Sequence, residues 1–433
     1  MSPIKLSLAA GSALLTLAGF AGTANAQAFY LQEQSARGAG RAFSGEAADT
    51  GADSLWWNPA SIAGMDQAEV SIHAAAILPR GDVSDRGTVI ARPGQPAAPV
   101  GGDAVTHNPI NNGVLPSGAI AIPITDRMAF GLAVTSPFSF TTDYPASSWA
   151  RYSADKTRLR TIDIQPSVAV ALTPWLRAGI GLNVEYTDAS LSNALPNVLA
   201  ALPDGRQQLK GDGWDVGWTA GAQVHGGPVT LGLAYKSPIK HDLKGDLTVS
   251  GLVGPLATSN LQLSNIHATF FTPSQAIGSI RFAATNRLTL NAQVVRYGWD
   301  RFDAIRLGVP VNAAIPENYR TSWSYAGGID YAISPAVTVR AGVQRALTPT
   351  QDTQRDARVP DSDRWNFGLG GSMAVTRNLT IDAAANYVTF ADAPIDRVTA
   401  AYAGTPAQTP IVTNGDLTNA HATVLSLGAR LKF

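Results

Sequence analysis

The chain has 433 residues, of which 45% are hydrophobic and 15% charged, and its 32 Lys and Arg residues balance its 32 Asp and Glu residues. A chain without net charge has no overall field to attract nucleic acid, so binding through a basic patch is excluded as its main role. It has no Cys, which excludes disulfides, thiol catalysis and Cys-based metal sites.

The first 26 residues have the pattern of a cleavable signal peptide. Lys5 precedes an uncharged apolar run that ends at Phe20, and Ala24-Asn25-Ala26 fits the small-x-small cleavage rule. We therefore expect the mature chain to begin near Gln27. Beyond this segment no apolar stretch is long enough to cross a bilayer as a helix, which excludes a helical membrane protein. No composition shift divides the remainder, so it is interpreted as one closed unit.

Alternation with the period of a β-strand dominates from about residue 68 onward. From Leu379 to Tyr387, for example, the apolar residues share one parity, whereas Thr380 and Asp382 share the other. A soluble sandwich would turn the apolar face inward, and a membrane barrel would turn it outward to lipid. The alternation alone leaves both architectures open.

The connections between these strands decide between the two architectures, because tight turns alternate with long polar loops. Tight turns are predicted at 125–127, 173–175, 225–228, 285–287, 334–336 and 376–378. Long loops are predicted at 79–102, 139–159, 191–211, 250–264, 301–320, 347–363 and 393–420. Short turns on one side and long loops on the other are typical of outer-membrane barrels. Residues 68–433 are therefore predicted to form an all-β, transmembrane antiparallel β-barrel of about fourteen strands.

The last predicted strand ends on an aromatic residue. Leu425, Leu427 and Leu431 share a parity with Phe433, the final residue. An amphipathic strand with a terminal aromatic is the signal read by the barrel-insertion machinery. We therefore expect the outer membrane of a Gram-negative-type cell as the location, with lipid and lipopolysaccharide as neighbours.

Residues 27–67 lack the alternation. They are rich in Gly and Ala, carry charged residues such as Arg37 and Asp49, and contain the turn Asn58-Pro59-Ala60. A compact polar segment ahead of a barrel is predicted to form a plug, or hatch, inside the lumen. A free N-terminal tail is the alternative.

Several short motifs resemble the FadL family of outer-membrane channels for long-chain fatty acids and other hydrophobic compounds. They are, in chain order, Ala28-Phe29-Tyr30-Leu31-Gln32-Glu33-Gln34-Ser35, Gly38-x-Gly40-Arg41-Ala42-Phe43-Ser44-Gly45-Glu46-Ala47, Asn58-Pro59-Ala60, Ser136-Pro137-Phe138, Leu209-Lys210-Gly211-Asp212-x-Trp214, Tyr235-Lys236-Ser237-x-x-x-His241-x-Leu243-x-Gly245-Asp246, Trp299-x-x-Phe302-Asp303 and Val359-Pro360-Asp361-Ser362-Asp363-Arg364. Their order and spacing carry the resemblance over essentially the whole mature chain.

The resemblance implies a fourteen-stranded barrel with an N-terminal hatch, and passive, ligand-gated uptake of a hydrophobic compound. Long-chain fatty acids are the first expectation, and neutral aromatic or aliphatic hydrocarbons are the alternative. The family releases its ligand sideways through a gap in the wall. Exposure to water costs an apolar chain about 0.8 kcal/mol per CH2 group, so release directly into lipid avoids that cost.

The family captures its ligand in an apolar groove formed by two outer loops. By resemblance these are 191–211 and 250–264, and the ligand-binding residues would be Leu191, Leu195, Val198, Leu199, Leu202, Leu252 and Leu256. The first five have helix-like spacing, so a small helix that packs on its neighbours is the alternative. Phe29 is the family-matched residue that would reach the pocket in the lumen.

Members that carry fatty acids supply a cation for the carboxylate, and Arg320 is the candidate here. A solvated loop arginine is the alternative. A second basic position of the family aligns with the neutral Asn193, and this departure keeps neutral hydrocarbons in consideration.

The wall gap of the family follows from a kink in its third strand. Here the gating residues would be Pro137, Phe138 and Ser139, where many members have Gly in place of Ser139, together with Asn58, Pro59 and Ala60 in the hatch. Pro cannot donate to a sheet ladder and so interrupts strand pairing. An ordinary proline at a strand end is the alternative.

Other functional classes find little support. The six histidines show no metal-binding spacing, and Gly370-Gly371-Ser372-Met373-Ala374 only half matches a nucleophile elbow, so neither an enzyme nor a metal or other cofactor is predicted. The predicted hatch and apolar outer loops disfavour a general porin, whereas a surface adhesin role is compatible with a channel. We expect a monomer, because each strand has partners within the chain.

Overall fold

Strands account for nearly all regular structure in residues 28–433, the part of the chain that the computed structural model describes. The predicted signal peptide, residues 1–26, lies outside the described residues. None of the helices in residues 28–433 is long and apolar enough to cross a membrane.

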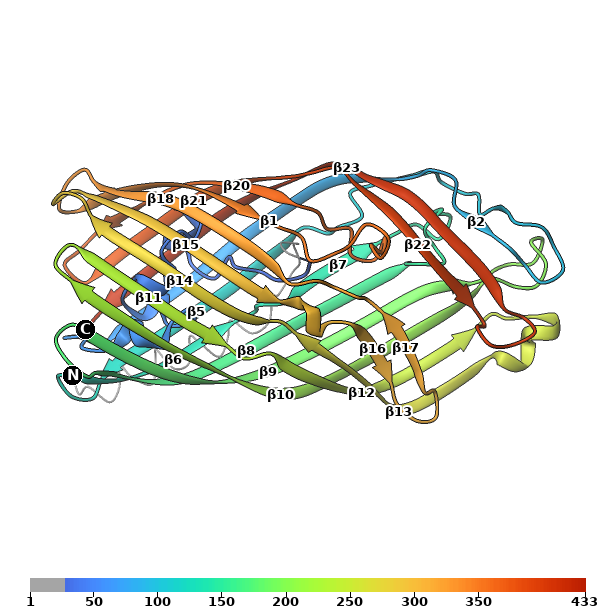
Figure 1. Ribbon diagram of the computed structural model, residues 1–433, viewed down its shortest axis with the longest axis horizontal. Helices are drawn as coiled ribbons and strands as arrows, with labels where there is room; N and C mark the ends of the chain where they lie inside the picture. The colour runs from blue at the N-terminus through green and yellow to red at the C-terminus, as the bar shows by residue number, and fades with distance from the viewer. Residues whose placement is uncertain (1–27) are drawn as a thin grey trace.

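The strand segments form one antiparallel sheet that closes into a barrel of fourteen strands, as predicted (Figure 1). In chain order they are β1 (Glu69–Asp85), β5 (Gly113–Pro123), β6 (Met128–Thr135) continued by β7 (Ser139–Asp143), β8 (Lys156–Ala171), β9 (Leu176–Leu195), β10 (Gly205–Gly226), β11 (Val229–Lys236) continued by β12 (Ile239–Ser250), β13 (Leu261–Thr272) continued by β14 (Ser274–Ala283), β15 (Leu288–Gly298), β18 (Ser322–Ala332), β19 (Val337–Ala346), β20 (Arg364–Ala374), β21 (Leu379–Phe390) continued by β22 (Ala393–Ala401), and β23 (Thr409–Lys432).

Shorter strands and helices lie in the outer loops and in the N-terminal segment. The outer loops contain β2 (Val89–Ile90), β3 (Ala98–Pro99), β4 (Val105–His107), η5 (Gly254–Ser259), η6 (Trp299–Arg301), β16 (Ala304–Leu307) and β17 (Ala313–Pro316). The N-terminal segment contains α2 (Ala36–Ala39), η2 (Glu46–Ala48), η3 (Ala52–Ser54) and η4 (Pro59–Ile62).

The first and last strands close the barrel. Strand β23 pairs with β1 from Glu69 opposite Lys432 to Asp85 opposite Gly415, and it pairs with β21 on its other side. All six predicted tight turns connect neighbouring strands. Several long loops were predicted too long, because β9 continues to Leu195, β10 begins at Gly205, and β22 and β23 run through the predicted loop at 393–420.

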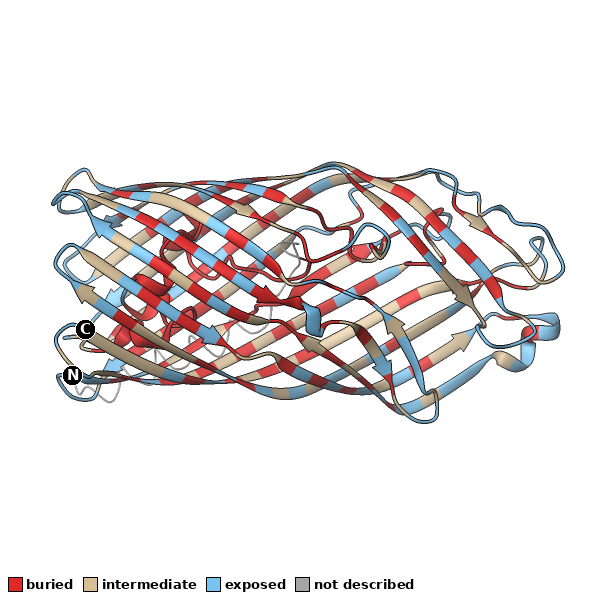
Figure 2. Cartoon of the chain, viewed as in Figure 1, coloured by how far each residue is buried: buried red, intermediate tan, exposed pale blue. Residues whose placement is uncertain are grey.

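Side chains alternate between lipid and lumen, with the apolar face outward. In β21 Asp382 and Asn386 are buried inside the barrel, whereas Tyr387 is 49% exposed. In β23 Leu425 and Leu427 are 51% and 64% exposed. Figure 2 shows this alternation of buried and exposed residues along the strands. The membrane-barrel interpretation is thereby confirmed over the soluble sandwich.

Residues 28–63 lie inside the barrel and are buried almost throughout (Figures 1 and 2). Inward side chains from several strands bind their backbone: Asn386 Nδ2 donates to the carbonyl of Ala39 at 2.9 Å, and Gln223 Nε2 donates to that of Asp49 at 2.7 Å. At Gly342 the wall approaches so closely that a Cβ atom would lie 2.1 Å from the Arg41 carbonyl oxygen. Glycine is therefore required there for the segment to pack.

A network of ion pairs fixes this segment to the wall. Arg41 contacts Asp49 at 2.6 Å and Glu46 at 2.7 Å within the segment, and its guanidinium lies 3.5 Å from Asp330 of β18. Burial opposes ionisation of Asp49, but the guanidinium groups of Arg281, Arg37 and Arg41 outweigh it and hold the pKa of Asp49 well below its usual range. Asp49 is therefore an ionised anchor at neutral pH.

Candidate functional site

An apolar pocket of about 50 Å³ lies in the lumen around Phe29. Phe29 is 2% exposed, and its ring centroid lies 4.9 Å from that of Trp299, 5.4 Å from that of Phe302 and 5.7 Å from that of Phe140. Leu191, Phe270 and Val359 complete much of the lining. The rings meet mostly edge to face, the arrangement that aromatic pairs favour. The structure thus places Phe29 in a lumenal pocket, as expected, and brings Leu191 to the same pocket.

A wider vestibule of about 430 Å³ lies above the pocket. Arg358 lines both cavities, and its guanidinium donates to Thr157 Oγ1 at 3.1 Å and to the Ser153 carbonyl. Arg397 also lines the vestibule and pairs with Asp356 at 2.7 Å. A cationic group therefore marks the passage from the vestibule into the apolar pocket.

One carboxyl group, that of Glu317, faces the same pocket. Its burial raises the pKa to about 7, although Arg397 lies 3.8 Å away and acts in the opposite direction. Glu317 follows β17 in an outer loop. The charge of the pocket therefore changes near neutral pH.

Arg320, the predicted partner for a carboxylate, lies outside this pocket. Its side chain is exposed, whereas the neighbouring Tyr319 is 7% exposed and packs its ring 4.9 Å from that of Phe302. The arginine that reaches the pocket, Arg358, immediately precedes the Val359-to-Arg364 motif. The position of Arg358 next to this family motif could have identified it as a pocket residue from the sequence. The sequence interpretation chose Arg320 instead.

Only some of the residues predicted to form the loop groove pack together in the structure. Leu195, Val198, Leu252 and Leu256 pack in one cluster with Tyr402, and three of them are buried, at 7%, 3% and 6% exposure for Leu195, Leu252 and Leu256. Leu199 is 54% exposed, and Leu202 is intermediate. The helix-like spacing of 191–202 is misleading, because Leu191 and Leu195 belong to strand β9 and residues 196–204 contain turns and bends.

The third barrel strand is broken at 136–138, between β6 and β7. Strand β6 pairs with β5 and β8, whereas β7 has β8 as its strand partner within residues 28–433. The N-terminal segment fills this break: the amide of Leu31 donates to the Pro137 carbonyl at 2.7 Å, and that of Ser139 donates to the Phe29 carbonyl at 3.2 Å. Pro137, Phe138 and Ser139 therefore lie directly beside Phe29.

Gln34 bridges the break from inside the barrel. Its side-chain amide donates to the Ser136 carbonyl at 3.1 Å, and its backbone carbonyl accepts from Ser117 Oγ of β5 at 2.9 Å. A residue of the N-terminal segment thus joins β5 to the broken strand. Contacts from the N-terminal segment therefore fill the break in this structure.

The turn Asn58-Pro59-Ala60 lies elsewhere. Asn58 begins η4, and its side-chain amide donates to the carbonyls of Ala47 and of Ala222 in β10. Helix η4 packs mainly against β8, β9 and β10. The structure therefore packs this turn mainly against β8, β9 and β10 rather than against Pro137.

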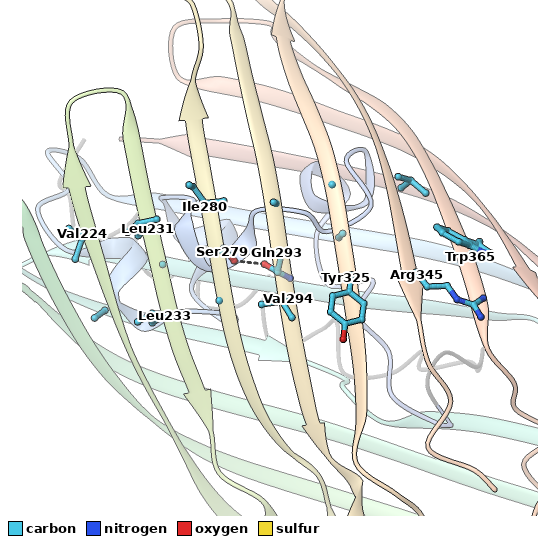
Figure 3. A pocket seen from close by; sticks show the side chains of 17 residues that line it. Val224, Leu231, Leu233, Ser279, Ile280, Gln293, Val294, Tyr325, Arg345 and Trp365 are labelled. Atoms are coloured by element: carbon cyan, nitrogen blue, oxygen red, sulfur yellow. Dashed lines mark hydrogen bonds between the residues drawn. The ribbon is translucent and has the colours of Figure 1, made fainter.

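A lipid-facing groove of about 820 Å³ lies on the outer surface across β11, β14, β15, β18 and β19 (Figure 3). It is lined by apolar side chains such as Leu233, Ile280 and Val294, and by Gly278 and Gly327, which leave it wide. The strands beneath it are paired along their lengths. The groove is therefore a depression in an intact wall, unlike the break at 136–138.

A closed antiparallel barrel with an apolar outer face, a lumenal apolar pocket and a filled break in its wall defines an outer-membrane transport protein. The match to a family model agrees: residues 17–433 match the family described as outer membrane protein transport protein (OMPP1/FadL/TodX). The chain belongs to this family of outer-membrane transporters, which are channels for hydrophobic compounds rather than enzymes.

Individual relatives are similar over most of their length. Outer membrane protein P1 of Haemophilus influenzae is 27% identical over 440 residues, covering 90% of each chain. The long-chain fatty acid transport protein of Escherichia coli K12 is 24% identical, covering 83% of this chain and 87% of that protein.

Solved structures share the fold. A FadL homologue from Pseudomonas aeruginosa superposes with a TM-score of 0.80 at 24% identity, over 94% of this chain and all of that one. The toluene transporter TbuX of Ralstonia pickettii gives a TM-score of 0.65 at 17% identity, over 93% and 99% of the two chains.

Proposed function

We propose that this protein takes up long-chain fatty acids passively and releases them sideways into the outer membrane, with residues 27–67 as its hatch. One observation carries the proposal: Phe29 lines the apolar pocket and at the same time hydrogen-bonds through its backbone to Ser139 at the wall break. Ligand arriving in the pocket would displace Phe29, and that movement would loosen the residues that fill the break.

The proposed route begins at the vestibule. Leu195 and Tyr402 of the outer cluster line this vestibule, and Arg358 lines both the vestibule and the pocket. Phe29, Phe140 and Phe302 would then enclose the hydrocarbon chain. Each CH2 group moved out of water contributes about 0.8 kcal/mol, so an acyl chain gains from every step inward.

Continuation along the barrel axis is unfavourable for such a ligand. Below the pocket the lumen is filled by residues 28–63 and by ion pairs such as Arg41 with Asp49 and Arg340 with Asp330, the latter at 2.7 Å. Separating buried ion pairs to admit an apolar chain would cost several kcal/mol. The break at 136–138 leads instead to lipid, where the chain stays out of water.

The head group is where two candidate ligands differ. Arg358 supplies a guanidinium suited to a carboxylate, which favours fatty acids. The rings of Phe29, Phe140, Phe270 and Phe302 form a neutral aromatic wall that would also suit a monoaromatic hydrocarbon. Neutral hydrocarbons are therefore the second candidate.

Arg358→Ala tests the head-group role. A charge-assisted hydrogen bond contributes about 1.5–3 kcal/mol, so oleate affinity should fall roughly 10- to 100-fold, whereas toluene uptake should stay within about twofold of wild type. Binding is measured on the purified protein, and uptake in a deletion strain that expresses each variant.

Arg320→Ala is the matched control, because its exposed side chain lies outside the pocket, and it should leave oleate binding nearly unchanged. Equal losses for oleate and toluene in Arg358→Ala, or a larger loss in Arg320→Ala, would reject the head-group role. Swelling of liposomes in sugar solutions would favour a general porin instead.

A further inference from the structure

A second, polar pocket of about 20 Å³ lies behind the wall break. Pro137 and Trp56 border it, and Asp163, Glu185, Lys236 and Gln275 supply its polar lining. Asp163, Glu185 and Gln275 are 2%, 1% and 3% exposed. This pocket shares no lining residue with the apolar pocket around Phe29.

Three carboxylates lie side by side on the strands at this pocket. Asp163 of β8 is opposite Glu185 of β9, and Glu185 is opposite Asp215 of β10. Like charges directly opposite each other on neighbouring strands are destabilising, and more so when they are buried. The row therefore requires either protonation of a carboxyl group or positive charge close by.

The neighbouring basic groups do not supply enough of it. In residues 28–433 the Lys236 ammonium forms no ion pair; it donates to Gln165 Oε1 at 3.3 Å and lies 4.0 Å from the Trp56 ring centroid. His241 is the other facing group, with Nδ1 3.3 Å from Asp215 and Nε2 3.5 Å from Glu185. Even with His241 protonated, two positive charges face three negative ones.

Three buried oxygen atoms also lack hydrogen-bond partners among the described residues: Asp163 Oδ1, Glu185 Oε1 and Gln275 Oε1. All three belong to residues that line the pocket. The pocket has room for a single species the size of water, since a water needs roughly 10–15 Å³ by the same measure. One water molecule has two hydrogens to donate, so it would leave one oxygen unpaired and the excess negative charge in place.

A small cation satisfies both requirements. Divalent Ca²⁺ takes six to eight oxygen ligands, and residues 28–433 contain no group of three or more His, Cys, Asp or Glu placed to hold a metal ion. We propose that this pocket binds one alkali-metal cation through Asp163, Glu185 and Gln275. The cation would join β8, β9 and β14 behind Pro137 and so stabilise the closed wall.

Ion-specific stability of the purified full-length mature protein tests this proposal. Thermal unfolding is measured at equal ionic strength in sodium, rubidium and choline chloride, because choline is too large for the pocket. The unfolding midpoint should be roughly 1–2 °C higher or more with the alkali ions. Crystals grown with rubidium chloride should show an anomalous peak beside Asp163 and Glu185.

Glu185→Gln keeps the shape of the side chain and removes one negative charge, so the ion dependence should disappear. Asp242→Asn is the matched control: this carboxylate lies on the neighbouring β12 with a 48% exposed side chain, and its loss should leave the ion dependence intact. If stability instead rises as the pH falls and does not depend on the alkali ion, protonation of the carboxyl groups neutralises the row and the proposal is overturned. An unfolding midpoint with the same response to ions and pH in wild type and Glu185→Gln, together with density for water alone, would overturn the proposal.

Discussion

At the scale of single residues, the pocket depends on which way each side chain of residues 317–320 faces. Glu317 and Tyr319 are buried, whereas Asn318 and Arg320 are exposed. Asn318 has a positive φ of 50°, so the chain turns there and a shift of one position separates a pocket residue from a surface residue. The sequence indicated the correct segment, but it could not indicate the side, because Arg320 and Glu317 are both charged and either could have faced a ligand.

Glu317 should make fatty-acid binding depend on pH. Burial raises the pKa of Glu317 to about 7, so the group is neutral below this pH and negative above it, while a fatty-acid carboxylate, with an ordinary pKa near 4 to 5, is ionised throughout. Oleate affinity should therefore fall about fivefold as the pH rises from about 6 to about 8, because two like charges then share a partly screened pocket. Titration of purified protein with oleate at both pH values provides the measurement.

Glu317→Gln should bind oleate equally well at both pH values, and toluene binding should be independent of pH in both proteins. A pH response that survives in Glu317→Gln would assign the effect to another group.

At the scale of elements, the alternation of apolar and polar residues predicted the strands within the membrane. It did not predict the parts of the strands that extend beyond the membrane. Strand β10 begins at Gly205 and continues through Arg206, Gln207 and Gln208. Above the lipid both faces of a strand meet water or polar loops, so the sequence there is polar on both sides and resembles a loop. The break at 136–138 was predictable because Pro137 has no amide hydrogen to donate. The partners that fill it, from Phe29 to Gln34, lie about a hundred residues away and required the structure.

A covalent link between the N-terminal segment and the break should stop uptake. Tyr30 and Phe138 form an antiparallel bridge, and paired residues of this kind have Cα atoms about 4.5–5.5 Å apart, within the range that a disulfide spans. The chain has no native Cys, so Tyr30→Cys with Phe138→Cys gives a single defined link. Labelled oleate uptake should fall at least tenfold in oxidised cells and recover on reduction.

A second cysteine pair provides the control for that experiment. Ala292 and Gly327 are opposite each other on β15 and β18 in the intact wall under the outer groove, and a disulfide there should leave uptake unchanged. Undiminished uptake through the oxidised Tyr30-to-Phe138 link would show that the segment does not move away from the break during transport.

At the scale of the whole molecule, the closed barrel follows from the outward apolar face and the long pairing of β23 with β1. The outward face was predicted from the alternation together with the short turns and long loops, whereas the pairing of β23 with β1 is seen only in the structure. The packing of residues 28–63 against the wall was not readable in the same way. Arg41 meets Asp330 through contacts between distant parts of the chain, and no local period encodes such a pair. The presence of a compact polar segment could be predicted, whereas its anchors could not.

Leu427 offers a test of the barrel as a whole, because it lies on the closing seam. It is 64% exposed and pairs with Ala74 of β1 and Ala383 of β21. It also lies about midway along the lipid-facing part of β23, between Thr423, which is opposite Tyr387, and the terminal Phe433. An arginine facing lipid near the bilayer midplane costs roughly 2–4 kcal/mol, since its charge must be hydrated or drawn to the interface. Leu427→Arg should lower the free energy of unfolding in lipid vesicles by that amount, measured by guanidinium titration, whereas Leu427→Ala should cost much less. If the arginine and alanine variants lost the same stability, Leu427 would not face lipid, and the orientation of the final strand would have to be revised.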